Sequence, residues 1–120
     1  MNRVEVKNGY IKASLDIFSY KEDNVRIVYS PALDLSGYGN TVEEAKRSFE
    51  IALKEYLRYC IENNTLGADL EKHGWKKIAA EPDYQSPDIV SLIRSNSNLR
   101  TLIKGNYHKM SKSLSVPYSC

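Results

Sequence analysis

The sequence is poor in the residues that mark secreted, metal-binding and membrane proteins. It contains two cysteines and two histidines in 120 residues, too few cysteines for a disulfide framework, and the four residues are too widely scattered for the ligand spacing of a common zinc site. No run of apolar residues approaches the roughly 20 that cross a bilayer, and no apolar signal stretch opens the chain. We therefore expect a cytoplasmic protein with no cofactor, no bound metal and no membrane contact.

The excess of basic over acidic side chains is also small, since the formal net charge is only +2. Such a small excess does not by itself indicate a nucleic-acid partner. The charge is nevertheless unevenly spread: residues 1–80 hold 12 basic and 12 acidic side chains, whereas residues 89–120 hold five basic and no acidic ones. We accordingly divide the chain into an αβ domain, residues 1–80, and a linker with a basic C-terminal extension, residues 81–120.

Two alternations of apolar and polar residues predict a β-hairpin near the start of the chain. Apolar side chains occupy every second position of residues 10–20, and again of residues 25–30, which is the period of a half-buried strand. A short charged turn separates the two stretches. Residues 4–6 predict a further, short edge strand. Pro31 ends the second long strand, and residues 33–36 then predict a third strand.

A long amphipathic helix follows, beginning at Thr41. Thr41 and Glu44 have the spacing of a capping box, in which each side chain satisfies an amide of the first turn. The two asparagines Asn63 and Asn64 end the helix. Its apolar residues recur at three- and four-residue steps, which predicts one face packed on the sheet. The residues of this stripe are Val42, Ala45, Phe49, Ala52, Leu53, Tyr56, Cys60 and Ile61. The predicted fold is α+β, a three-stranded antiparallel sheet with a long packed helix.

Few side chains suggest chemistry. Gly37 and Gly39 flank Tyr38 and are expected to shape a turn; a phosphate-binding loop would need a wider glycine spacing and a lysine. His73 and His108 have no cysteine or carboxylate cluster around them in the sequence, so neither predicts a metal site.

Asp16 and Asp34 are the carboxylates that a metal-dependent nuclease built on these strands would use. No strand places a third carboxylate beside them, and isolated aspartates are more often a surface charge and a turn residue. We therefore expect no enzymatic activity.

The remainder of the chain predicts short elements. Residues 69–74 predict a short helix, after which Trp75 and Ile78 return to the core, and residues 81–87 predict a linker or an extended crossover. Ser86 is the expected cap of a further short helix.

Two short apolar faces, in residues 89–93 and 99–103, predict two helices, and alternation over residues 108–116 predicts a final strand. The helices could form a small helix-turn-helix. They could instead pack locally, with the strand adding to a sheet edge of this chain or of a dimer mate, and their shortness favours this second interpretation.

Four segments of the central stretch together resemble a known family. They are the strand Val25–Tyr29, the turn Ser30-Pro31-Ala32-Leu33, the segment Ser36-Gly37-Tyr38-Gly39-Asn40-Thr41 and the helix opening Glu43-Glu44-Ala45. In this combination, over roughly residues 10–63, the chain resembles the HicB family of bacterial antitoxins. The resemblance implies a partial ribonuclease-H-like fold and a toxin–antitoxin system in which the chain binds a HicA-like toxin, a small basic RNA-cleaving protein. It also implies a homodimer or a higher oligomer.

The chain departs from that family after residue 80. Many members carry a C-terminal DNA-binding module that represses their own operon, and this sequence has neither a ribbon-helix-helix nor a full helix-turn-helix there. The resemblance therefore supports toxin binding more than repression.

Tyr29, Asp34, Tyr38 and Glu43 are the residues expected to bind the partner. Aromatic groups supply contact area, and carboxylates complement a basic protein. The alternative function is a DNA-binding transcriptional regulator that acts through the basic tail. Its candidate DNA-binding residues are Arg94, Arg100, Lys104, Lys109 and Lys112.

Overall fold

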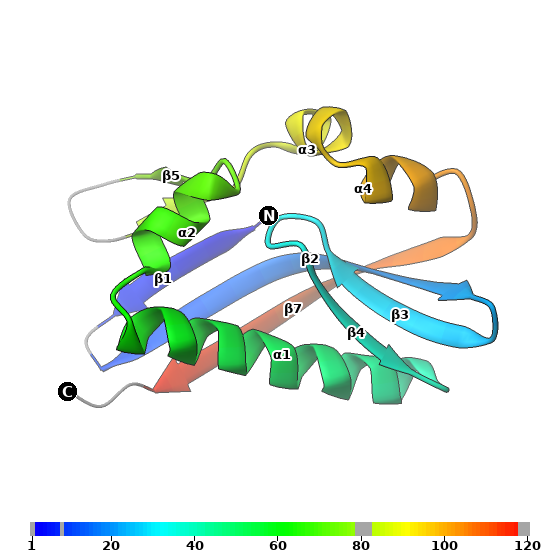
Figure 1. The fold of residues 1–120 in the computed structure, drawn as a ribbon, viewed down its shortest axis with the longest axis horizontal. Helices are drawn as coiled ribbons and strands as arrows, with labels where there is room; N and C mark the ends of the chain where they lie inside the picture. The colour runs from blue at the N-terminus through cyan, green and yellow to red at the C-terminus, as the bar shows by residue number, and fades with distance from the viewer. Residues whose placement is uncertain (1, 8, 79–82, 118–120) are drawn as a thin grey trace.

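Strand β2 is the centre of the sheet, because three other strands pair with it. In this computed structural model, which describes residues 2–7, 9–78 and 83–117, β7 pairs with one edge of β2, and both β1 and β3 pair with the other (Figure 1). Beyond them, β4 pairs with β3, β6 with β1 and β5 with β6. The strands are β1 (Arg3–Lys7), β2 (Tyr10–Glu22), β3 (Val25–Ser30), β4 (Leu35–Gly39), β5 (Lys76–Lys77), β6 (Asp83–Gln85) and β7 (Tyr107–Pro117).

The predicted α+β class with an antiparallel sheet is confirmed. The sheet has seven strands in the described residues, however, where the sequence predicted three. Two of the additional strands, β6 and β7, come from the segment predicted to be a linker and an extension, and they complete the same sheet as residues 1–80. The helices are α1 (Val42–Glu62), α2 (Leu66–Lys72), α3 (Ile89–Ser95) and α4 (Ser97–Leu102). No described helix is both long and apolar enough to span a membrane.

Helix α1 begins where the capping box predicts. The Thr41 hydroxyl accepts a hydrogen bond of 3.1 Å from the backbone N–H of Glu44, and Asn63 is the C-cap. One face of the helix is buried against the sheet, as the apolar periodicity predicts. That face consists of Ala45, Phe49, Leu53, Leu57 and Cys60. Leu57 was absent from the predicted stripe, whereas Val42, Ala52, Tyr56 and Ile61 are only partly buried.

Strand β4 corrects the prediction for residues 33–36. The strand runs over Leu35–Gly39, so both glycines lie in it and not in a turn. A Cβ atom on Gly37 would lie 2.2 Å from the backbone nitrogen of Phe49 and 2.5 Å from the carbonyl oxygen of Ala45. Glycine is required here because the backbone of β4 lies directly against that of α1.

The sheet is also covered on part of its second face. The pairing register puts Phe18, Ile27 and Tyr29 on the face opposite α1, and all three are buried. In Figure 1, α1 lies below β3 and β4, and α3 and α4 lie above them. The sequence predicted the two short helices, but the cap of α3 is Asp88 and not Ser86, because the Asp88 carboxylate accepts the N–H of Ser91 at 2.8 Å.

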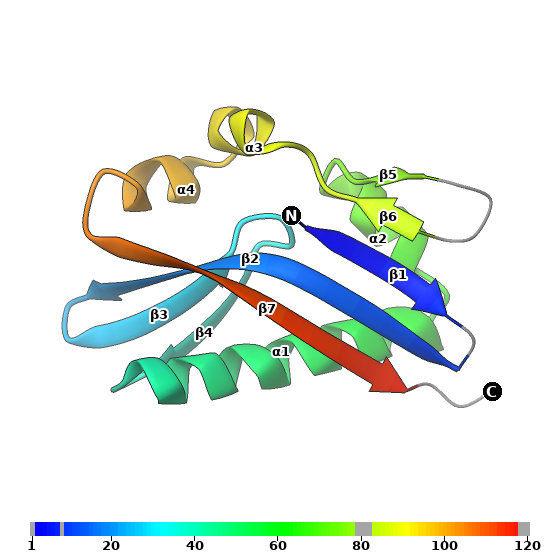
Figure 2. The same cartoon turned by 180° about the vertical axis from the view of Figure 1, so that it is seen from behind.

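The last strand adds to the sheet of its own chain. β7 pairs with residues 10–20 of β2, which confirms the strand that the alternation predicted and its addition to a sheet edge of this chain. Even-numbered residues of β7 lie on the face of α1, where Lys112 donates to Glu50 at 2.9 Å. Odd-numbered residues lie on the face that Figure 2 shows with no helix in front of β1, β2 and β7.

The structure of the segment after α1 agrees with the prediction only in part. α2 spans Leu66–Lys72 rather than 69–74, and Gly74 follows its cap with a φ of +84°. Trp75 returns to the core and is 2% exposed, whereas Ile78 is partly buried. Residues 79–82, which include part of the predicted linker, lie outside the described residues.

Candidate functional site

The turn between β3 and β4 holds one carboxylate in a fixed position. Asp34 has a left-handed backbone conformation, with a φ of +55°, which aspartate tolerates better than most residues. The hydroxyl of Tyr29 donates a hydrogen bond of 2.6 Å to its Oδ1 atom. The side-chain amide of Asn96 donates in turn to the Tyr29 oxygen at 2.9 Å. The orientation of Asp34 is thus set by residues of β3 and of the α3–α4 junction.

This carboxylate lies on a polar groove between three parts of the chain, which we call the Asp34 groove. The turn after β3, the end of α2 and the helices α3 and α4 form its walls, and its volume is about 560 Å³. Its lining residues are Pro31, Asp34, Lys72, His73, Gly74, Pro87, Ser91, Leu92, Ser95, Asn96, Ser97 and Asn98. Serine and asparagine side chains dominate, so the groove offers both donors and acceptors of hydrogen bonds.

Burial keeps the Tyr29 hydroxyl protonated. Removal from water, and after it the hydrogen bond to Asp34, raises the pKa of Tyr29 to about 12. At neutral pH this hydroxyl is therefore a donor to Asp34.

Tyr29 itself is buried, although the sequence analysis expected its side chain to bind the partner. Its ring is packed under α3 and α4, and only 3% of the residue is exposed. The prediction that it contacts a partner is therefore replaced by a positioning role, in which its hydroxyl holds Asp34. The alternation of apolar residues predicted β3 correctly. It could not predict that α3 and α4 cover this face, because that contact joins segments far apart in the sequence.

Tyr38 and Glu43 are both exposed. Tyr38 lies on β4 with 57% of the residue exposed, and its backbone N–H donates to the Ser48 hydroxyl of α1 at 3.1 Å. The register places its side chain on the same face as Tyr29. Glu43 lies in the first turn of α1, where a carboxylate favours the positive end of the helix. No described contact joins either side chain to Asp34.

The five basic residues of the tail do not share one surface. Lys109 and Lys112 project from opposite faces of β7, and each lies near a carboxylate: Lys109 is 3.9 Å from Asp16, and Lys112 is 2.9 Å from Glu50. Pairing with Lys112 is the main cause that lowers the pKa of Glu50.

The other three basic residues belong to the two short helices and the turn after them. Arg100 donates to the carbonyl oxygens of Ile93 and Arg94 at 2.9 and 2.6 Å, so it satisfies free carbonyls at the end of α3. Arg94 and Lys104 are exposed. With seven and six residues, α3 and α4 are both shorter than a helix that usually enters a major groove.

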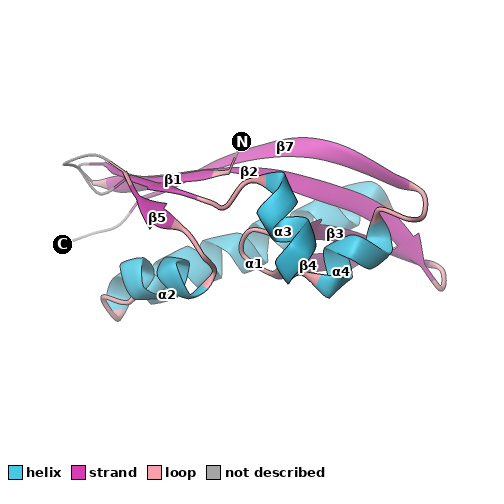
Figure 3. Ribbon diagram, turned by 90° about the horizontal axis from the view of Figure 1, so that it is seen from above, coloured by secondary structure: helices cyan, strands magenta, loops and turns pink. Residues whose placement is uncertain are grey.

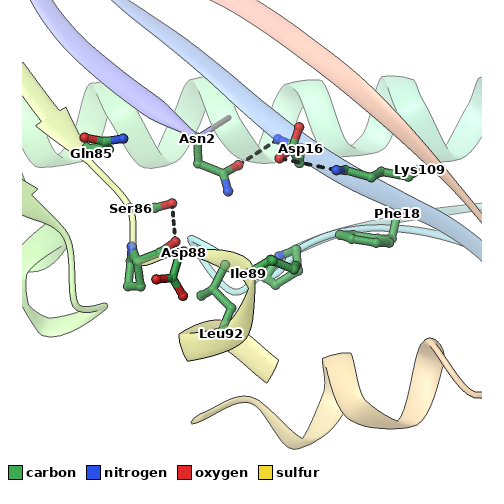
Figure 4. Close-up of a pocket in the computed structure, with 11 residues that line it drawn as sticks. Asn2, Asp16, Phe18, Gln85, Ser86, Asp88, Ile89, Leu92 and Lys109 are labelled. Carbon is green, nitrogen blue, oxygen red and sulfur yellow. Dashed lines mark hydrogen bonds and ion pairs between the residues drawn. The ribbon is translucent and has the colours of Figure 1, made fainter. Parts of the chain in front are cut away.

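A second, smaller cavity of about 320 Å³ lies beneath α3 and contains Asp16 (Figure 4). The Asp16 N–H donates to the side chain of Asn2 at 2.7 Å, and Lys109 points toward the Asp16 carboxylate in Figure 4. Asp16 and Asp34 line different cavities.

No group of three or more metal-ligating side chains occurs among the described residues. His73 bonds through its Nδ1 atom to the carbonyl oxygen of Asp69 at 2.9 Å, and His108 is exposed on β7. Cys60 is buried, and that burial is the main cause that raises the pKa of its thiol. The other cysteine, Cys120, lies outside the described residues.

Sequence reasoning missed the asparagines of the groove. The apolar faces of residues 89–93 and 99–103 left the polar segment Asn96-Ser97-Asn98 between them without a role. Asn96 nevertheless caps α4, accepting the N–H of Leu99 at 2.9 Å, and its side-chain amide also donates to Tyr29. An asparagine directly before the first residue of a helix is a capping signal. Its second bond, to a residue 67 positions away, has no local signal.

No family model, curated protein or solved structure matches the chain. The fold and the groove define an α+β protein with an exposed carboxylate on a polar surface. Any assignment of function therefore depends on the chemistry of that surface.

Proposed function

We propose that this chain is an antitoxin of the HicB type, which binds a small basic HicA-like ribonuclease and blocks its active surface. The observation that supports it most is the fixed carboxylate of Asp34 on an open polar groove. A carboxylate whose orientation is already set loses little conformational freedom when a lysine or arginine binds to it.

The strand after the turn and the start of α1 add two exposed groups that suit a basic partner. Tyr38 supplies an exposed aromatic ring from β4, and Glu43 supplies a second carboxylate from the start of α1. Aromatic residues are enriched at interfaces, and opposite charges on the two partners increase the rate and the specificity of association. Lys72 also lines the groove, so the matching partner carries both a basic group for Asp34 and acceptors for this lysine.

Binding to DNA through the tail has less support. Of the five basic residues proposed for it, Arg100 caps α3 and two lysines lie beside carboxylates of the sheet and of α1. A phosphate backbone is bound by several free cations on one surface, which this arrangement does not offer.

The first experiment is a pull-down of the tagged full-length chain from its native host, with mass spectrometry of the proteins that co-purify. We expect a stoichiometric small basic protein whose expression alone stops growth and whose toxicity this chain relieves. Recovery of the chain with no such protein would contradict the proposal.

The recovered complex allows a direct test of the surface. Replacing Asp34 with asparagine and Tyr38 with alanine together should weaken binding at least tenfold, while the melting temperature changes little, because both residues are exposed. A matched control replaces Glu62 with glutamine and Tyr59 with alanine, an exposed acidic and an exposed aromatic residue at the far end of α1. Equal affinity of both double variants would remove Asp34 and Tyr38 from the interface.

A further inference from the structure

The outer edge of β7 is not paired by any described strand. β7 spans Tyr107–Pro117 and pairs with β2 on one side only. In Figure 3 it lies at the outside of the sheet, with no described element beyond it. A long open edge of this kind is a template for another strand, and proteins usually block it with a bulge, a proline or lysines.

The residues whose backbone groups point outward can be identified. The Asp16 N–H donates to Asn2, which lies away from β7, and Asp16 is the register partner of Ser111. Hydrogen-bonded and non-bonded pairs alternate along an antiparallel ladder. The odd-numbered residues of β7 therefore direct their N–H and C=O groups to the open edge. Within the strand these include Lys109, Ser111, Ser113 and Ser115.

The usual protection of this edge is weak. The only proline of β7 is its last residue, and the serines on the open face are small and uncharged. Lys109 and Lys112 are the charges that would repel a second strand, but the carboxylates of Asp16 and Glu50 lie within 3.9 and 2.9 Å of them. Both lysines are thus partly neutralised within their own chain.

We propose that β7 pairs with β7 of a second copy of this chain, antiparallel, with Ser113 of both copies at the two-fold axis. Both copies then keep α1 on the same side of one continuous sheet.

This register suits the side chains. Ser111 lies opposite Ser115 of the other copy, and Met110 lies opposite Val116, so polar pairs form on the open face and apolar pairs on the face of α1. Each Lys112 lies opposite Leu114, whereas an axis at Lys112 would bring the two lysines together. The pairing does not depend on the proposed toxin, and the two ideas can fail separately.

Light scattering of the full chain, without any partner, tests the pairing. We expect twice the chain mass of 13.7 kDa at about 100 μM. Ser113→Pro should give a monomer of unchanged fold, because the N–H that it removes points outward and proline is tolerated at such edge positions. Ser113→Ala retains that N–H and should stay dimeric. If Ser113→Pro unfolds, Ser113→Lys replaces it, and its dimer should return at high salt as the two facing charges are screened.

Spin labels locate the axis. Cysteines introduced one at a time at 111, 113 and 115, in a Cys120→Ser background where the remaining Cys60 is buried, should give the shortest label separation at 113. The separations at 111 and 115 should both be longer than at 113 by similar amounts, because the two equivalent positions are then offset by four residues of strand, or about 14 Å along its axis. The proposal would be overturned by a monomeric wild-type chain or by a dimer that both Ser113→Pro and Ser113→Lys leave intact. A shortest label separation at a position other than 113 would also overturn it. So would an edge that is occupied only by a different protein.

Discussion

The indole Nε1–H of Trp75 donates a hydrogen bond of 2.7 Å to the carbonyl oxygen of Ala32. Both residues are buried, and they lie 43 positions apart. Ala32 belongs to the turn that carries Asp34, so this bond ties the turn to the segment after α2. The wall of the Asp34 groove that α2 supplies is thereby fixed to the carboxylate it faces.

Replacing Trp75 with phenylalanine should destabilise the protein by at least about 1–3 kcal/mol, because a buried carbonyl loses its donor and part of the indole volume is left empty. Chemical denaturation measures this change in the free energy of unfolding. Tyr59→Phe is the control, since Tyr59 is 65% exposed and should change stability by only a few tenths of a kcal/mol. Equal stability of the two variants would mean that the Trp75 bond contributes nothing.

Gly37→Ala should cost at least about 1–3 kcal/mol, the usual cost of overpacking. The added methyl group would lie 2.2 Å from the Phe49 backbone nitrogen, so α1 must move away from β4. Gly105→Ala is the matched control, because the nearest atom to its new Cβ, the Leu102 oxygen, is 3.8 Å away. Thermal and chemical unfolding of both variants should separate them clearly, and a tolerated Gly37→Ala would show that the helix is not seated as described.

Stability should fall at alkaline pH through Tyr29. The pKa of this hydroxyl is about 12 in the folded protein, against an ordinary value of 10. Its contribution is therefore fully present below pH 10 and is lost as the pH rises through 12, because the unfolded chain releases the proton first. Denaturation curves between pH 8 and 11 measure the slope.

Tyr29→Phe should reduce that slope while it lowers stability at pH 8, where the hydrogen bonds to Asp34 and Asn96 are lost. The slope will not vanish, since burial also raises the pKa values of Tyr20 and Tyr56. An unchanged slope in Tyr29→Phe would indicate that this hydroxyl ionises in the folded protein as easily as in the unfolded one.

The parts of the fold that local sequence patterns determine were predicted well. The capping box at Thr41 gave the start of α1, and strict alternation gave β2, β3 and β7. β4 was misplaced because Gly37 and Gly39 suggest a turn, whereas here the glycines allow strand and helix backbones to touch. β5 and β6 have two and three residues, too few for a periodic pattern, and exist because β6 pairs with β1 and β5 pairs with β6.

The candidate site was predicted less completely. Asp34, Tyr38 and Glu43 were identified as exposed groups, and all three are exposed. Tyr29 looked the same in the sequence but is buried, because α3 and α4 fold over the second face of the sheet. Neither the groove nor the bond from Asn96 to Tyr29 follows from any local pattern, since each needs segments that are distant in the sequence.

The pairing of β2 with β7 has a consequence for the order of events in biosynthesis. Ser14 and Ser113, which face each other across these strands, are 99 residues apart. During synthesis β2 leaves the ribosome long before β7, so one edge of the central strand has no partner strand until β7 is made. Contacts of such wide sequence separation slow folding. During that interval the nascent chain is open to strand exchange with its neighbours on the same messenger.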